Sequence, residues 1–179
     1  MNLFDALIED SIIAPLPLKN GEQRREIWIC IRTDGAIGEG SRVNPYNGAT
    51  QPLFDALMRF VNETSKVQAN MTVRLGPGVF QTRGGDGGGF VGAWRPQSGQ
   101  RIIGSGMHAT ILQLVDAGAI FQDVGQNVIG SNSNVNNFEI SDLTLDCNFA
   151  RQLNPDGDPD NYNNVMLAGE LETENLLML

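Results

Sequence analysis

Beyond residue 70 the sequence consists of short apolar runs separated by corners rich in Gly, Asn and Asp. Within the runs apolar and polar residues alternate, as in segments 72–75 (TVRL) and 110–114 (TILQL). A period of two is typical of strands with one buried face, and a helical period is absent here. This pattern predicts an all-β domain built as a sandwich, a barrel or a solenoid. Further strands are expected at 27–31, 79–80, 101–103, 138–140, 143–145, 165–167 and 176–179.

Two amphipathic helices are predicted ahead of these runs. The first covers residues 2–10, and a Pro-containing linker at 14–17 follows it. The second covers 51–63, where Thr50 can cap the first turn and Pro52 fits inside it. Its apolar stripe consists of Leu53, Phe54, Leu57, Met58 and Val61. We therefore expect a helix and linker over 1–26 and a β domain over 27–179 that includes the second helix and continues beyond residue 179.

The charge of the chain limits its partners. Twelve basic and 21 acidic side chains give a formal net charge of −9, and no basic run is present. Nucleic-acid binding needs clustered Lys and Arg, so it is not expected. An anionic polysaccharide would be repelled unless a divalent cation bridged it. No segment approaches the 18 apolar residues of a membrane span. No export signal is recognised in this sequence, and the location stays open between the cytoplasm and an extracellular or virion protein.

The segment 104–109 (GSGMHA) follows the apolar pair at 102–103. Gly-x-Gly-x-x-Ala after a strand matches the phosphate-binding turn of a dinucleotide-binding unit. That turn requires a helix directly after the glycines. The sequence continues instead with β-branched and apolar residues that favour a strand. We therefore expect Gly104 and Gly106 to form a tight corner between two strands.

Five motifs occur in an order that resembles a known superfamily. They are Asp-Gly at 34–35, Gly-Ala-Thr at 48–50 before the helix, VRLGPGVF at 73–80, IIGSG at 102–106, and ISDLTLD at 140–146. Together they resemble the N-terminal part of the pectate-lyase-like superfamily, which includes polygalacturonases and phage tailspikes. The resemblance implies a short right-handed parallel β-helix, an all-β solenoid with an N-terminal helical cap. Gly48-Ala49 stands where the family has an acidic pair.

The resemblance implies a polysaccharide-associated module. Only about four coils of 20–30 residues fit into this chain, and family enzymes carry their catalytic residues on later coils. Whether the chain is an enzyme, a lyase or glycoside hydrolase, is left open. The alternative is a non-catalytic structural or self-assembling protein of a virion or a surface.

Asp142 and Asp146 are the candidate catalytic residues. They are four residues apart in a predicted strand, so both are expected on one face, with Leu143 and Leu145 on the other. Glycosidases and lyases need two acids, or an acid and a metal, so an outward carboxylate pair suits such chemistry. A pair of solvated surface carboxylates beside a turn is the other interpretation.

Two more candidate sites lie elsewhere. Asp156, Asp158 and Asp160 alternate along an acidic loop, whose oxygens suit calcium as a possible cofactor or else form a solvated turn. Trp94 and Arg95 are candidates for binding a polysaccharide or oligosaccharide, provided that the indole is exposed; packing in the wall of the domain is the alternative.

The segment 176–179 (LLML) has no polar capping repeat after it in this sequence. Solenoids need capped ends because the last repeat exposes unpaired backbone groups and core side chains. We therefore expect an open C-terminal edge that either continues into further coils or associates with a second copy to form a homo-oligomer.

Overall fold

The computed structural model describes residues 26–67, 70–84, 94–115, 128–131, 135–148, 167–169 and 177–178. The helix and linker expected before residue 26 lie outside the described residues. The described part contains one helix, α2 (Gln51–Val67), and strands whose bounds are β1 (Glu26–Cys30), β2 (Tyr46–Asn47), β3 (Thr72–Leu75), β4 (Gly78–Thr82), β5 (Arg101–Ile103), β6 (Thr110–Leu114), β7 (Ile129–Ser131), β8 (Glu139–Ser141), β9 (Thr144–Asp146), β10 (Leu167–Gly169) and β11 (Leu177–Met178).

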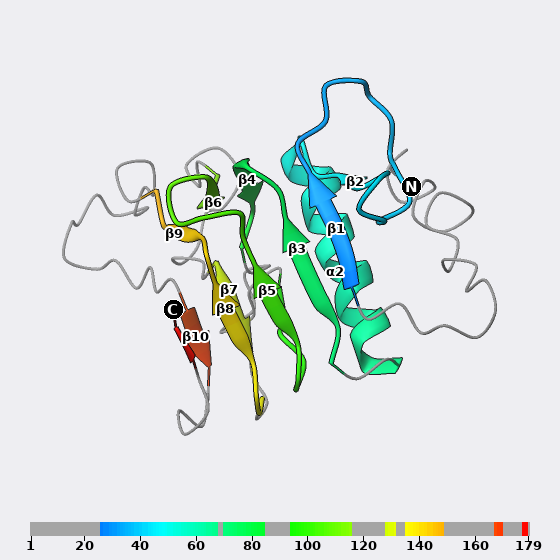
Figure 1. Ribbon diagram of the computed structural model, residues 1–179. Helices are drawn as coiled ribbons and strands as arrows, with labels where there is room; N and C mark the ends of the chain where they lie inside the picture. Colours follow the sequence, from blue (N-terminus) through cyan, green and yellow to red (C-terminus); the bar gives the residue numbers. More distant parts are fainter. Residues whose placement is uncertain are drawn as a thin grey trace, which may run out of the picture.

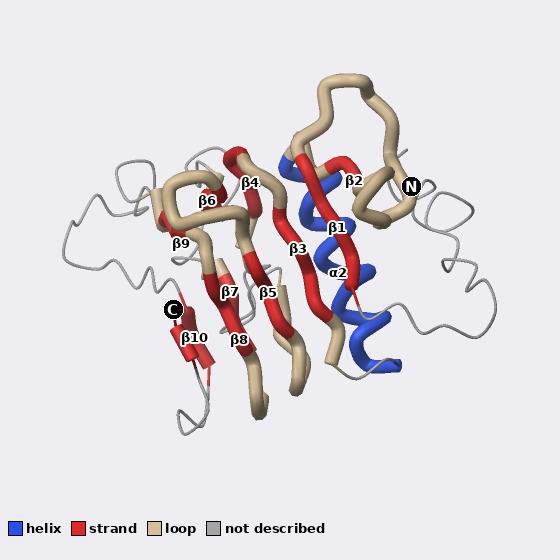
Figure 2. The backbone as a smooth tube through the Cα atoms, viewed as in Figure 1, coloured by secondary structure: helices blue, strands red, loops and turns tan. Residues whose placement is uncertain are grey.

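The strands form three sheets in which every pairing is parallel (Figure 1). The largest sheet has six strands in the order β11-β8-β5-β3-β1-β2. A second sheet has three strands in the order β4-β6-β9, and a third pairs β10 with β7. Figure 2 shows the strands of the six-stranded sheet side by side, with α2 behind β1 and β3.

The core follows from the register of these strands. In the six-stranded sheet Ile27, Val73, Ile102 and Ile140 are paired in one row, and all four are buried. In the three-stranded sheet Phe80 is paired with Leu112, which is paired with Leu145. The alternation read from the sequence therefore places one side of each strand in a shared interior.

The helix α2 belongs to the same core. Phe54, Leu57, Met58 and Val61 are buried, and the ring of Phe54 lies 5.2 Å from that of Phe80. The helix begins at Gln51, as the sequence predicts, and it ends at Val67, four residues beyond the predicted end at residue 63. This helix, the one helix in the described part of the chain, is not long and apolar enough to cross a membrane.

The expected all-β class is wrong. The structure is a mixed α/β fold, in which a 17-residue helix supplies part of the core beside the parallel sheets. Within the described residues the sheets form separate sets and do not join into a closed solenoid, so the expected short right-handed parallel β-helix is wrong as well. Alternation specifies which side of a strand is buried, but it does not specify how separate sheets are connected or what covers them.

The expected corner at Gly104 and Gly106 is confirmed, because the next element along the chain is the strand β6 and not a helix. Gly104 N donates to Ser141 O at 2.9 Å, and Gly106 N donates to Asp142 O at 2.9 Å. Ser105 N donates to the hydroxyl of Thr110 at 2.8 Å. These three amides, which would face phosphate in a dinucleotide site, are therefore used inside the protein.

Candidate functional site

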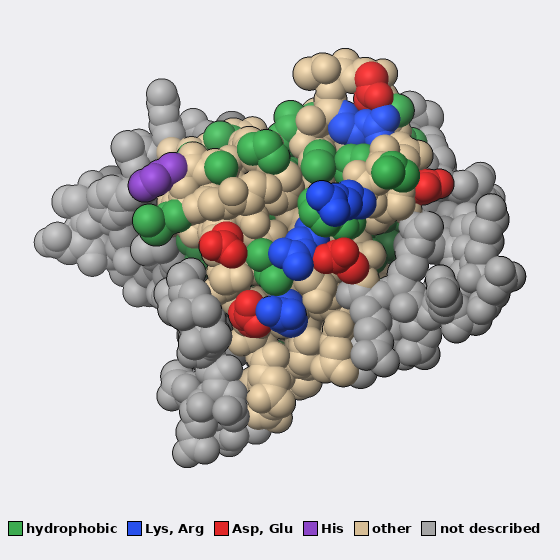
Figure 3. Space-filling model, viewed as in Figure 1, with side chains coloured by type: hydrophobic (Ala, Val, Ile, Leu, Met, Phe, Trp, Pro, Cys, Tyr) green, Lys and Arg blue, Asp and Glu red, His purple; other side chains and the backbone are tan. Residues whose placement is uncertain are grey.

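One face of the six-stranded sheet carries a row of charged side chains. We call it the charged face and define it by Glu26 and Trp28 of β1, Arg74 of β3, Arg101 of β5, Glu139 of β8, and Arg42 from the loop after β1. Figure 3 shows basic and acidic side chains alternating over the middle of this face. The row arises because the neighbours of these residues in each strand, such as Ile27 and Ile102, point into the core.

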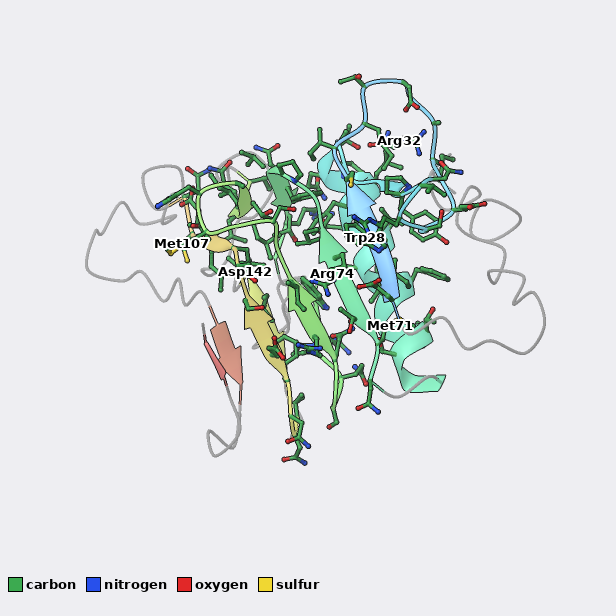
Figure 4. All side chains as sticks on the ribbon, in the orientation of Figure 1. Trp28, Arg32, Met71, Arg74, Met107 and Asp142 are labelled. Carbon is green, nitrogen blue, oxygen red and sulfur yellow. The ribbon has the colours of Figure 1, made fainter. Side chains whose placement is uncertain are left out.

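The first half of the charged face is centred on Glu26. Arg74 Nε donates to Glu26 Oε1 at 2.7 Å, and the indole N–H of Trp28 donates to Glu26 Oε2 at 3.2 Å. Figure 4 shows Trp28 and Arg74 on neighbouring strands, where they are paired in register. The hydrogen bond from Arg74 lowers the pKa of Glu26. The guanidinium of Arg42 lies 5.6 Å from the centre of the Trp28 ring, a cation–π contact.

The second half of the charged face is a bidentate pair. Arg101 donates through Nε to Glu139 Oε2 at 2.7 Å and through Nη2 to Glu139 Oε1 at 3.1 Å. The two residues are direct cross-strand partners. The hydrogen bonds from Arg101 lower the pKa of Glu139, which favours the ionised carboxylate.

These ion pairs fix the positions of their side chains but contribute little to the free energy of unfolding. The Arg74 and Arg101 side chains are 36% and 48% exposed, and Glu26 is 45% exposed. Exposed ion pairs of this kind contribute about 0–1 kcal/mol each. Their main effect is to fix donors and acceptors in defined positions on a surface that solvent reaches.

The candidate catalytic residues do not lie on one strand. Asp142 follows β8 of the six-stranded sheet, is exposed and has a left-handed φ of 56°, whereas Asp146 ends β9 of the three-stranded sheet. The premise of a single strand is wrong, because β8 ends at Ser141 and β9 begins only at Thr144, so Asp142 lies between the two strands. Gln113 Nε2 donates to one oxygen of Asp146 at 2.8 Å and Asn148 N donates to the other at 2.7 Å. Their catalytic role stays a prediction.

The candidate sugar-binding Trp94 is buried. Only 1% of this residue is exposed, and it forms a parallel bridge with Ile129. The expectation that its ring stacks on a sugar is wrong for this reason, and the core-packing alternative holds. Arg95, the next residue, is exposed.

The proposed calcium ligands Asp156, Asp158 and Asp160 lie outside the described residues. Among the residues that the structure describes, no group of three or more His, Cys, Asp or Glu side chains is placed to hold a metal ion.

The charged face was missed by sequence reasoning, although a signal for it exists. Its strand residues occupy outward positions next to apolar residues in the runs at 26–30, 72–75, 101–103 and 139–141. Placing the predicted strands side by side would have shown opposite charges on neighbouring strands.

No family model, curated protein or solved structure matches this chain. The class of this protein therefore rests on its fold and its site alone. It is a mixed α/β protein with parallel sheets and an exposed face of paired charges. The resemblance to the pectate-lyase-like superfamily stays a prediction from its five sequence motifs.

Proposed function

We propose that this protein is a polysaccharide-associated module that binds a glycan chain across the charged face without cleaving it. The observation that carries the proposal is the pair of arginine–glutamate contacts and the indole N–H, all fixed on one exposed parallel sheet. A sugar hydroxyl is both a donor and an acceptor. A face that presents fixed guanidinium N–H groups next to carboxylate oxygens offers both kinds of partner to each hydroxyl.

The sheet sets the spacing of these groups. Neighbouring strands lie about 4.7–4.9 Å apart, so side chains on β1, β3, β5 and β8 repeat at that distance across the sheet. This repeat is comparable to the length of one sugar unit in an extended glycan. A glycan that runs across the strands would therefore meet a polar side chain from each strand in turn.

Trp28 supplies an apolar surface at one end of the row. Its side chain is partly exposed, and Arg42 covers its ring from an exposed loop position. An indole presents both a flat apolar face and a polar N–H, which suits a sugar ring with its C–H groups and hydroxyls. Binding at this end would require the Arg42 side chain to move off the ring.

Binding without cleavage is supported by the state of the candidate acids. Both oxygens of Asp146 accept hydrogen bonds within the protein, and Asp142 lies outside the strands, between β8 and β9. A general acid and its partner need to reach one glycosidic bond together.

The proposal is tested by isothermal titration calorimetry with a panel of neutral and acidic hexasaccharides. We expect micromolar to millimolar binding to at least one of them, weakened about five- to twelvefold by Arg101→Ala or Trp28→Ala. Each loss removes hydrogen-bonding or stacking groups worth about 1–1.5 kcal/mol. Gln81→Ala is the matched control, because Gln81 is an exposed polar residue of the three-stranded sheet. No binding to any hexasaccharide, or an equal loss in Gln81→Ala, would contradict the proposal.

A second candidate function is self-assembly through the edge of the six-stranded sheet. β11 is the last strand in the sheet order and pairs with β8 on one side; on its other side no strand is present among the described residues. A strand edge presents unpaired backbone groups that can pair with another chain. Multi-angle light scattering would then show a concentration-dependent oligomer that Leu177→Lys weakens and Val43→Lys, a change at an exposed loop residue, does not. A monomer at all concentrations would exclude this function.

A further inference from the structure

The charges of the face narrow the kind of glycan that it suits. We infer that the ligand of the charged face is an uncharged, hydroxyl-rich glycan and not an acidic one. This inference rests on the proposed function and specifies its substrate class. It follows from how the arginines of the face are engaged and from which charges would meet the ligand.

The arginines on the strands are already neutralised. Arg74 is bonded to Glu26, and Arg101 is bonded to Glu139 through two of its nitrogens. A carboxylate on a ligand would compete with Glu139 for the same planar arrangement of donors, and the displaced Glu139 would then face it with a like charge. A hydroxyl group avoids this competition, because it can donate to the carboxylate and accept from the remaining guanidinium N–H groups.

The third arginine does not reverse this balance. Arg42 contacts the ring of Trp28 at 5.6 Å. With it, the six side chains of the face carry three positive and two negative charges, a net charge of one. The whole chain carries a formal charge of −9, which repels a polyanion as it approaches. A single cation above a ring, on a strongly acidic protein, is a poor basis for binding a chain with one negative charge on every sugar.

The test compares uncharged hexasaccharides, namely cellohexaose, maltohexaose and mannohexaose, with hexagalacturonate in calorimetric titrations at 20 mM and 500 mM NaCl. We expect at least one uncharged hexasaccharide to bind ten or more times more tightly than hexagalacturonate at both salt concentrations. Its affinity should change less than about twofold between them, because no net charge is neutralised on binding.

Charge variants locate the effect on the face. Glu139→Gln frees Arg101 while keeping the shape of the side chain, and we expect it to raise the affinity for hexagalacturonate about tenfold. Glu63→Gln is the matched control, since Glu63 is an exposed residue of α2 and the change alters the net charge equally. Equal effects of the two variants would overturn the local charge argument.

The remaining outcomes separate the inference from the function on which it rests. Tighter binding of hexagalacturonate than of every uncharged hexasaccharide, lost at 500 mM NaCl, would overturn the inference and leave glycan binding standing. No binding of any of the four probes by the unmodified protein would overturn both.

Discussion

Replacing Gly104 by alanine is expected to lower the free energy of unfolding by about 3 kcal/mol, because the corner has no room for a side chain. A Cβ at this position would lie 2.1 Å from the carbonyl oxygen of Asp142 and 2.8 Å from Cβ of Leu143. The carbonyl oxygen cannot simply move away, since Gly106 N donates to it at 2.9 Å. The clash would therefore push apart the two stacked corners between β5 and β6 and between β8 and β9. Urea unfolding followed by circular dichroism measures the loss.

Gly35→Ala is the control for this substitution. Gly35 has a φ of 71°, and a Cβ there would meet nothing within 4 Å. Only the cost of a left-handed backbone, about 1–2 kcal/mol, is expected. A loss in Gly104→Ala no greater than that in Gly35→Ala would show that the corners are not packed as described.

Replacing Asp55 by alanine is expected to cost about 2–3 kcal/mol, because a buried carboxylate joins α2 to the end of β4. Asp55 accepts from the Thr82 hydroxyl at 2.6 Å, from Arg83 N at 3.1 Å and from Gln51 Nε2 at 2.5 Å. Without it the Thr82 hydroxyl, on a residue only 3% exposed, loses this acceptor. Thermal and urea unfolding measure the change. Glu63→Ala, at an exposed position of the same helix, is the control, with a smaller expected effect of about 0–1 kcal/mol, as for exposed charged groups.

The pH dependence of stability distinguishes a role of the Asp55 charge from simple packing. Burial raises the pKa of Asp55 above its ordinary value of 3.8. A raised folded-state pKa gives a contribution that is present below the unfolded-state pKa and is lost as the pH rises through the folded-state value. We therefore expect the unmodified protein to lose stability relative to Asp55→Asn as the pH rises from about 4. A difference that does not change with pH would contradict this assignment.

The stability contributed by three other carboxylates changes with pH in the opposite direction; they belong to Asp34, Glu26 and Glu139. Hydrogen bonds from Arg32 lower the pKa of Asp34 to about 2, and those from Arg74 and Arg101 lower the pKa of the two glutamates. Their contributions are present above the unfolded-state pKa and are lost as the pH falls through the lowered values. Comparing Asp55→Asn with the unmodified protein at each pH removes these shared contributions.

The positions of most strands follow from local alternation. Segments 72–75, 101–103 and 110–114 have the bounds that the sequence predicts. The short strands β2 (Tyr46–Asn47) and β7 (Ile129–Ser131) were missed, because Tyr-Asn and Ile-Gly-Ser each contain one large apolar residue beside residues that are typical of loops. How the sheets are arranged around α2 depends on contacts between distant residues, which no local pattern specifies.

The candidate site was harder to predict for the same reason. Arg101 and Glu139 are 38 residues apart in the chain, and Glu26 and Arg74 are 48 apart. Each residue alone is an ordinary outward residue of a strand, and only the register brings opposite charges together. The sequence left two interpretations of Trp94 open, because a tryptophan between Ala93 and Arg95 is compatible with both a surface and a core position; the structure places it in the core.

The order of strands in the sheets has a consequence for how the protein is made. In the six-stranded sheet β2 lies on the outer side of β1, and on the other side of β1 the strands β3, β5, β8 and β11 follow one another in chain order; β4, β6 and β9 of the three-stranded sheet are also in chain order. Chains are synthesised from the N-terminus at about 5–20 residues per second. In both sheets each of these strands therefore leaves the ribosome after the strand with which it pairs, so no pairing has to wait for a later part of the chain.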